Sequence, residues 1–176
     1  QTDLSDGVRH LVGEGMVDAD RVCIVGSSYG GYAALQGMVT EPDVYRCAVS
    51  VAGVSDLPEM LEAEGRQGGG TSNNPVIRYW TRFMGADSRR DSVLRDLSPA
   101  LQASAVQGPI LLIHGRDDTV VPLAQSEIMN RALRSAGKDT RLIVLDGEDH
   151  WLSYAPTRMR TLEATVDFLL EHNPPD

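Results

Sequence analysis

The chain has 176 residues, of which 41% are apolar and 23% are charged, and its 25 acidic and 16 basic side chains give a formal charge of −9. At roughly 150 residues per domain, this length predicts one globular domain with a sizeable core. The acidic balance argues against a nucleic-acid partner and against an anionic membrane surface. No apolar run approaches the roughly 20 residues that span a bilayer, so we expect a soluble protein.

The chain begins with Gln1 rather than Met, and it enters a helical pattern with neither a signal peptide nor a first strand. We therefore expect the back part of a longer protein, located in the cytoplasm. Cys23 and Cys47 lie in apolar stretches, and we expect two buried thiols rather than a bridge. No metal-ligand spacing is present, and nothing in the sequence predicts an organic cofactor.

Helical and strand patterns alternate along the chain, as the spacing of apolar residues indicates. The expected elements are, in order, a helix from Leu4 to Gly15, a strand at Arg21 to Val25 buried on both faces, a helix from Gly30 to Glu41, a strand at Cys47 to Val54, a strand at Ile110 to His114, a helix around Ile128 to Ala136, a strand at Arg141 to Leu145 and a helix from Pro156 to Asn173. This alternation predicts an α/β protein, with a mostly parallel sheet and helices on both of its faces.

The segment from about 57 to 108 has a different character, and we expect it to form a lid-like insertion in a single domain. Its glycine run at 68–70 predicts a mobile loop, and it lacks the lysine that a phosphate-binding loop requires. The aromatic group Tyr79, Trp80 and Phe83 predicts a short helix. We expect these rings to cover the core rather than to line an acyl pocket. The arginines around them are expected to form a solvated face rather than to bind a substrate carboxylate.

The strongest chemical signal is Gly26-Ser27-Ser28-Tyr29-Gly30-Gly31, between the first expected strand and the helix after it. A nucleophile on such a sharp strand-to-helix turn needs small flanking residues, because a side chain at Gly26 or Gly30 would clash with a neighbouring element. The pattern predicts Ser28 as the nucleophile and Ser27 as a free position. The alternative is a glycine-rich turn that only packs a helix on a strand.

A serine nucleophile needs a general base, because its hydroxyl is not ionised at neutral pH. His150 follows the last strand, at the edge where the loops of a parallel sheet gather, and is the expected base. His114 ends a strand and is expected to fix a turn, whereas His10 and His172 are expected to face solvent.

A third residue must hold the tautomer of the base by accepting a hydrogen bond from its other ring nitrogen. Asp117 and Asp118 leave the third strand at the same edge, and a carboxylate there precedes the histidine in the order Ser, Asp, His. Asp56 is a weaker candidate. Asp146 and Asp149 are too close to His150 in sequence, and we expect them to cap the loop.

An oxyanion hole needs two donors. The backbone N–H of Tyr29, the residue after the nucleophile, is the expected first donor. The second normally comes from a loop after an earlier strand, and the sequence offers no such strand before Arg21.

These segments together resemble the C-terminal catalytic region of the prolyl oligopeptidase family of serine peptidases, most closely its acylaminoacyl-peptidase and dipeptidyl-peptidase branch. The resemblance covers nearly the whole chain. It is carried by the stretch from Gly26 to Ala34, Ala52-Gly53-Val54-Ser55-Asp56-Leu57, Ser98-Pro99, Ile113-His114-Gly115 through Asp118 to Val121-Pro122, and Gly147 to His150.

The resemblance implies an α/β-hydrolase fold and hydrolysis of short peptides or acylated amino acids. In that family the acid falls four residues after the histidine of the His-Gly pair, which selects Asp118 over Asp117. The family's β-propeller and the first strands of its sheet have no counterpart here. The expected fold is therefore a partial hydrolase domain.

The sequence predicts a serine hydrolase that cleaves an amide or ester bond through an acyl-enzyme, with Ser28, Asp118 and His150 as the triad. Two alternatives stay open: a small carboxylesterase acting on short acyl esters, and a non-catalytic fragment that serves in assembly. Missing strands beside the first strand would expose an apolar edge, so we expect a homo-oligomer.

Overall fold

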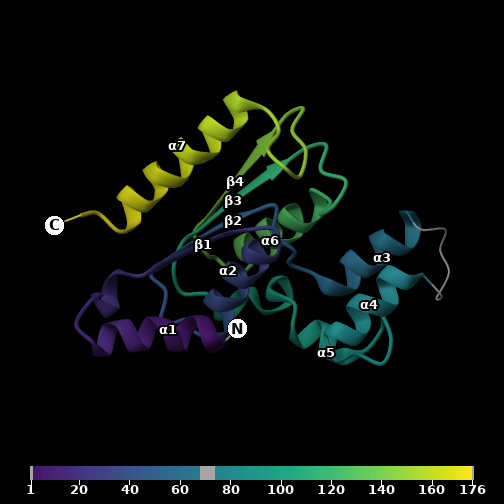
Figure 1. Cartoon of the computed structure of the whole chain (residues 1–176), viewed down its shortest axis with the longest axis horizontal. Coiled ribbons are helices and arrows are strands. Elements are labelled where there is room, and N and C mark those ends of the chain that lie inside the picture. The colour runs from purple at the N-terminus through teal and green to yellow at the C-terminus, as the bar shows by residue number, and fades with distance from the viewer. Residues whose placement is uncertain (1, 68–73, 176) are drawn as a thin grey trace.

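The computed structural model describes residues 2–67 and 74–175, in which four strands form one parallel sheet in the order β1-β2-β3-β4 (Figure 1). The strands are β1 (Cys23–Ser27), β2 (Cys47–Val51), β3 (Ile110–Gly115) and β4 (Thr140–Leu145). The helices are α1 (Thr2–Gly13), η1 (Ala19–Arg21), α2 (Tyr29–Thr40), α3 (Leu57–Gln67), α4 (Pro75–Phe83), α5 (Ser92–Asp96), η2 (Pro99–Ala105), α6 (Ala124–Ser135) and α7 (Ala155–His172).

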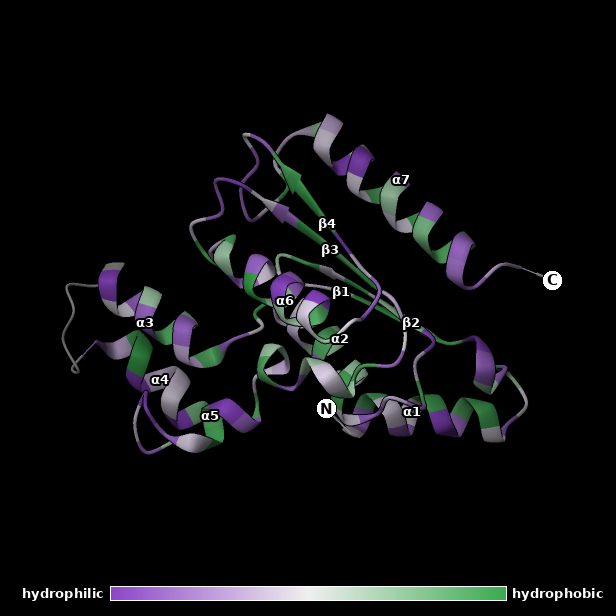
Figure 2. Ribbon diagram, turned by 180° about the vertical axis from the view of Figure 1, so that it is seen from behind, coloured by the Kyte–Doolittle hydropathy of each residue, from purple (hydrophilic) through white to green (hydrophobic). Residues whose placement is uncertain are grey.

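Helices cover both faces of the sheet, because successive side chains of a strand point to opposite sides. Ala48 of β2 and Leu112 of β3 pack with α2, α6 and η2, whereas Val49 and Leu111 pack against α7 and its buried Phe168. Figure 2 shows this pattern as largely hydrophobic strands between helices that alternate in hydropathy along their length. The predicted α/β architecture, with a parallel sheet between two helical layers, is confirmed.

The first strand differs from its prediction, because β1 lies at an edge of the sheet and pairs only with β2 among the described residues. The side chain of Val25 is 49% exposed, whereas all five residues of β2 are buried. The prediction that this run is buried on both faces is therefore wrong. A continuous apolar run predicts a strand, but it does not distinguish a central position in the sheet from an edge position.

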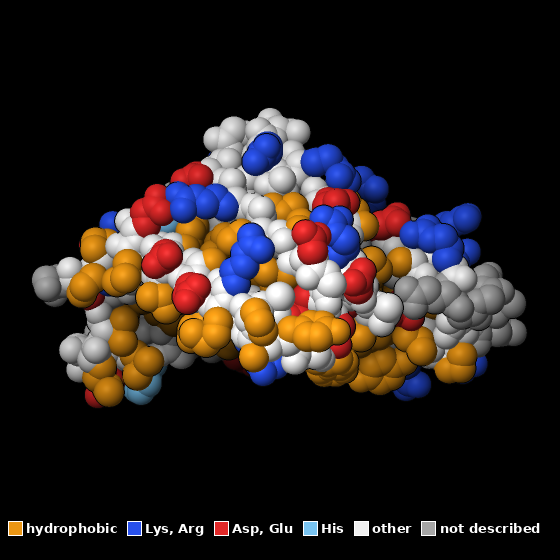
Figure 3. Space-filling view, turned by 90° about the horizontal axis from the view of Figure 1, so that it is seen from above, with side chains coloured by type: hydrophobic (Ala, Val, Ile, Leu, Met, Phe, Trp, Pro, Cys, Tyr) orange, Lys and Arg blue, Asp and Glu red, His pale blue; other side chains and the backbone are white. Residues whose placement is uncertain are grey.

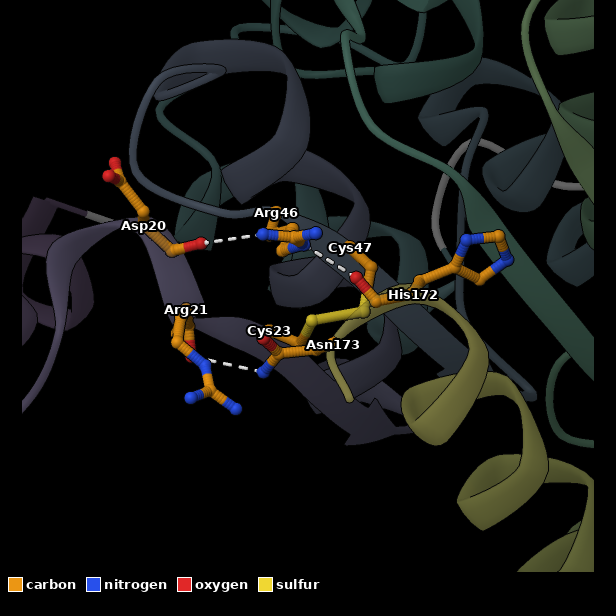
Figure 4. The surroundings of a disulfide bond; sticks show 7 residues. All are labelled: Asp20, Arg21, Cys23, Arg46, Cys47, His172 and Asn173. Carbon is orange, nitrogen blue, oxygen red and sulfur yellow. Dashed lines mark hydrogen bonds between the residues drawn. A yellow bond between two sulfur atoms is a disulfide. The ribbon is translucent and has the colours of Figure 1, made fainter. Parts of the chain in front are cut away.

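The prediction of two free thiols is also wrong, because Cys23 and Cys47 form a disulfide (Figure 4). The two residues are direct partners in the parallel register of β1 and β2, which brings their Cα atoms to 4.7 Å. Next to the bridge, the Nε of Arg46 donates to the carbonyl of His172 at 2.5 Å and its Nη1 donates to the carbonyl of Asp20 at 3.3 Å. These contacts join the start of the sheet to the end of α7.

Helices α3, α4 and α5 lie together to one side of the sheet (Figure 1). Helices α3 and α5 share a hydrophobic cluster that contains the buried Leu61 and Leu94, and Tyr32 of α2 also packs against it. The two ends of this segment meet, because Ala100 N–H donates to the carbonyl of Ser55 at 3.0 Å and Leu57 N–H donates to Ser98 Oγ at 2.9 Å. Helix η2, which follows, packs in the main core. The glycine run at 68–70 lies outside the described residues.

Within residues 2–67 and 74–175, no helix combines the length and the apolar character needed to cross a bilayer.

We predict that reducing the disulfide lowers the free energy of unfolding by about 3 kcal/mol. The bridge joins residues 24 positions apart. On the entropic model, closing a loop of that size lowers the conformational entropy of the unfolded chain and so raises its free energy by about this amount. Urea unfolding with and without a thiol reductant measures the effect. The double variant Cys23→Ser, Cys47→Ser is the control, since the reductant should not change its midpoint. Two free thiols in the unreduced, unfolded wild type would contradict the bridge.

Candidate active site

Ser28 occupies the sharp turn between β1 and α2. Its backbone has φ 57° and ψ −121°, a conformation that costs energy for a residue with a side chain and is typical of functional turns. Ser28 N–H donates to the carbonyl of Val51 at 2.8 Å, which fixes the turn to β2. A Cβ at Gly26 would lie 2.1 Å from the carbonyl oxygen of Gly30, so that position requires glycine. The same expectation for Gly30 is wrong, since a Cβ there would meet open space.

An unbroken line of hydrogen bonds joins the three residues that the sequence singled out. Nδ1 of His150 donates to Oδ2 of Asp118 at 2.7 Å, and Nε2 of His150 accepts from Oγ of Ser28 at 3.0 Å. The second distance is within the reach of a nucleophile and its base. Asp118 and His150 are both largely buried, with 7% and 9% of their surface exposed. Residues 28, 118 and 150, which are far apart in the chain, thus meet at the carboxyl ends of β1, β3 and β4.

The Asp118 carboxylate is held from several sides. Its Oδ1 accepts from the N–H groups of Val120 at 2.9 Å and Val121 at 2.8 Å. Burial raises the pKa of Asp118, but hydrogen bonds from His114, His150 and these two amides more than offset it. The net pKa therefore lies below the ordinary value of 3.8. Asp118 is thus ionised at neutral pH.

The other histidines form no hydrogen bond with Ser28 among the residues that the structure describes. His114 is fully buried, and its ring bonds Ser126 Oγ at 2.7 Å and the carbonyl of Val121 at 2.8 Å, as expected for a histidine that fixes a turn. His10 is exposed, whereas His172 is half-buried and its ring packs on Phe168 with centroids 4.5 Å apart. The prediction of solvent exposure is therefore wrong for His172.

The remaining carboxylates act within their own loops. Asp56 accepts from the N–H of Glu59 in the first turn of α3 at 3.0 Å. Asp149 accepts from Trp151 N–H at 2.9 Å, as expected for a loop cap. Asp146 instead pairs with Arg116 at 2.6 Å. None of these three contacts His150 through a hydrogen bond in the described part of the chain.

Sequence reasoning missed Glu148, a fully buried carboxylate two residues before His150. It accepts from the N–H of Asp149 at 3.0 Å, from the N–H of Ser153 at 2.8 Å and from the hydroxyl of Thr157. These donors belong to its own loop and to the first turn of α7, so Glu148 fixes the loop that carries His150. Burying such a group without donors would cost several kcal/mol. The only signal in the sequence is a Glu two residues before the candidate base.

The loops that carry Asp118 and His150 also touch through their backbones. Asp117 N–H donates to the carbonyl of Glu148 at 2.9 Å. A Cβ at Gly115 would lie 2.5 Å from that same carbonyl oxygen, so only glycine allows this approach. Main-chain contacts thus hold the loops of Asp118 and His150 at a fixed spacing.

A pocket of about 350 Å³ opens beside Ser28, between the sheet edge and helices α3 and α4. The residues that line it are largely apolar or aromatic: Ser28, Tyr29, Tyr32, Val54, Leu57, Met60, Leu61, Glu64, Trp80, Phe83, Met84, Leu97, Val120 and Val121. Trp80 and Phe83 therefore line the pocket and do not cover the core, contrary to expectation. Tyr79 is 60% exposed and stacks on Phe83.

Burial raises the pKa of Tyr32, another residue of the pocket, to about 12. Its hydroxyl therefore stays protonated and donates to the carbonyl of Leu97 at 3.0 Å.

The arginines of α4 and of the turn between α4 and α5 do not line this pocket. Arg78, Arg82 and Arg90 are exposed, and Arg89 pairs with Glu62 at 3.6 Å. None of them lines the pocket, which agrees with the expected solvated face.

Comparison with known proteins gives consistent matches over nearly the whole chain. Residues 1–174 match the model of the prolyl oligopeptidase family. Dipeptidyl aminopeptidase BIII of Pseudoxanthomonas mexicana is 31% identical over 96% of this chain and 24% of its own length. Dipeptidyl peptidase family member 6 of Caenorhabditis elegans is 27% identical over 84% of this chain and 20% of its own. A puromycin-hydrolyzing peptidase of Mycobacterium tuberculosis superposes with a TM-score of 0.80, at 29% identity over 97% of this chain and 24% of that one. The chain thus spans a fifth to a quarter of the length of these proteins.

The lowered pKa of Asp118 predicts a pH-dependent contribution to stability. Because the pKa is lower in the folded chain than its ordinary 3.8, the contribution is complete above that value and is lost as the pH falls through the folded pKa. The difference in unfolding free energy between the wild type and Asp118→Asn should therefore be constant above about pH 5 and shrink as the pH falls from about 4 through the folded pKa. Urea unfolding across pH 3 to 7 measures this, with exposed Asp117→Asn as the control for loss of charge. A difference that grows on acidification would contradict the assignment.

Proposed function

Because the chain belongs to the prolyl oligopeptidase family, we propose that it carries the catalytic centre of a serine hydrolase that cleaves amide or ester bonds through an acyl-enzyme. The observation that carries this proposal is the line of hydrogen bonds from Ser28 Oγ through His150 to Asp118. Its distances and its order are those that nucleophilic catalysis by serine requires.

In the proposed reaction, Ser28 Oγ attacks the substrate carbonyl while Nε2 of His150 takes the hydroxyl proton. Asp118 holds the ring in the tautomer with a proton on Nδ1 and stabilises the imidazolium that forms. The imidazolium then gives its proton to the leaving amine or alcohol, and the acyl group stays on Ser28. A water molecule, deprotonated by His150, releases the acid and restores the hydroxyl.

The backbone N–H of Tyr29 is the proposed first oxyanion donor. Tyr29 is the first residue of α2, so its amide has no acceptor within the helix and lies at the positive end of the helix dipole. Negative charge that develops on the carbonyl oxygen next to Ser28 would be stabilised there.

The substrate class follows from the relatives and from the pocket. The relatives are a dipeptidyl aminopeptidase and a puromycin-hydrolyzing peptidase, and the pocket beside Ser28 is small and mostly apolar. We therefore propose short peptides or acyl esters as substrates. Helices α3 and α4 contribute residues to the pocket lining, which fits the proposed lid-like insertion at about 57–108.

We predict that Ser28→Ala lowers hydrolysis of matched p-nitrophenyl ester and p-nitroanilide substrates by roughly four orders of magnitude or more. A fluorophosphonate probe should label the wild type and not the variant. Exposed Ser88→Ala, in the insertion, is the matched control. A chain that the probe fails to label would favour the non-catalytic alternative. Strong ester and negligible anilide hydrolysis would favour the carboxylesterase.

We also propose that the chain forms a homo-oligomer. Two apolar features support this: the exposed edge at Val25 of β1 and a stripe along α7. The stripe consists of Met159, Leu162, Val166 and Leu170, which are 43–57% exposed. Figure 3, which views the molecule from the side of α7, shows apolar side chains reaching this surface among charged ones. An apolar surface of this kind is typically covered by another chain.

We expect light scattering at micromolar concentration to give a mass above the 19.1 kDa of one chain. The double variant Leu162→Glu, Val166→Glu should shift the mass toward the monomer, because it places two like charges in the stripe. Leu101→Glu, at an apolar position of η2 that is 44% exposed, is the control and should leave the mass unchanged. A monodisperse wild-type monomer would contradict the proposal.

The proposed location in the cytoplasm bears directly on the disulfide. Thiols are kept reduced in that compartment, so the Cys23–Cys47 pair would be open there, whereas the bridge would persist in an oxidising compartment. Alkylation of free thiols at the moment of cell lysis distinguishes the two locations.

A further inference from the structure

The pocket beside Ser28 contains one charged side chain, that of Glu64. Helix α3 contributes Leu57, Met60, Leu61 and Glu64 to the pocket wall, at the spacing i, i+3, i+4 and i+7. Residues at this spacing share one face of a helix. Glu64 therefore belongs to the same face as the apolar residues that form the pocket, and it is half-buried there.

Glu64 lies at the far end of the pocket from the nucleophile. Leu57, the first residue of α3, lines the pocket together with Ser28, and α3 runs from there away from the sheet (Figure 1). Glu64 is seven residues further on, which is about 10 Å along a helix. It is also in the last turn of α3, where free carbonyl groups add partial negative charge. The pocket thus leads from a serine hydroxyl over apolar walls to a negatively charged end.

The charge of Glu64 is not neutralised by the described residues. The neighbouring carboxylates of α3 are paired: Glu59 with Arg66 at 2.7 Å and Glu62 with Arg89 at 3.6 Å. Glu64 has no ion pair or hydrogen bond with any residue among 2–67 and 74–175. The pocket lining includes no lysine or arginine. It does include Trp80 and Phe83, whose ring faces attract cations.

We propose that this pocket binds a substrate side chain with an apolar stem and a cationic end, of the arginine or lysine type, with Glu64 as the residue that selects the cation. The stem packs between α3 and α4, and the cationic end pairs with the Glu64 carboxylate. A partly exposed ion pair with an aromatic neighbour contributes modestly to the binding free energy. We therefore expect a roughly tenfold preference for the cationic side chain over a neutral one. This inference rests on the proposed hydrolase function, because it places the side chain beside Ser28.

The test compares two peptide anilides that differ only in the residue before the scissile bond, arginine or citrulline. Citrulline keeps the length and shape of arginine and removes its charge. The wild type should hydrolyse the arginine substrate with a kcat/KM roughly tenfold higher. Glu64→Gln should bring the two rates together by lowering the arginine rate and leaving the citrulline rate unchanged. Glu62→Gln removes an equal charge from another face of α3 and should behave as the wild type.

A binding measurement separates this inference from the hydrolase proposal. Titration calorimetry of the corresponding peptide amides on Ser28→Ala should give a Kd about tenfold lower for arginine than for citrulline, and adding Glu64→Gln should remove the difference. Hydrolysis without a charge preference would overturn the role of Glu64 and leave the hydrolase proposal standing. A Glu64-dependent binding preference without hydrolysis would support the cation site and overturn the hydrolase proposal. Equal Kd values would overturn the cation site.

Discussion

The buried carboxylate of Asp118 is the interaction on which the site depends. One oxygen accepts two backbone amides and thereby closes the turn after β3, and the other accepts the ring proton of His150. An ionised group that is buried to this extent is tolerated only with such a set of donors. The same donors that lower its pKa also fix its position. The orientation of His150 toward Ser28 therefore follows from how the β3 loop satisfies one carboxylate.

The sheet brings these groups together because parallel strands end at one edge. Ser28 reaches this edge through a strained backbone, which the glycine at position 26 makes possible by letting α2 approach β1. The loops after β3 and β4 reach it through the close backbone contact at Gly115. Glu148 then holds the second of these loops from within. Local backbone geometry at the strand ends thus positions the side chains of Ser28, Asp118 and His150. Few contacts between distant segments are needed to bring them together.

Much of this arrangement could be predicted from the sequence. The glycine pattern around Ser28 and the order Ser, Asp, His are local signals, and the three residues do meet. The disulfide was not predictable, because the parallel register that pairs Cys23 with Cys47 is a property of the sheet and not of either segment. The role of Glu148 was hidden because two of its donors are backbone amides, which no side-chain pattern reveals. The aromatic residues Trp80 and Phe83 predicted a short helix, but the sequence did not indicate which surface that helix faces.

The segment that holds α3, α4 and α5 is closed on itself at its base. Its two ends meet in hydrogen bonds between Ser55 and Ala100 and between Leu57 and Ser98, whereas Ser28, Asp118 and His150 all lie outside it. The segment between these ends forms walls of the pocket and contributes no group to the hydrogen-bonded triad. Changes within this segment would therefore alter the pocket while Ser28, Asp118 and His150 keep their positions. Under the proposed function, selectivity could then change without a change in the reacting groups.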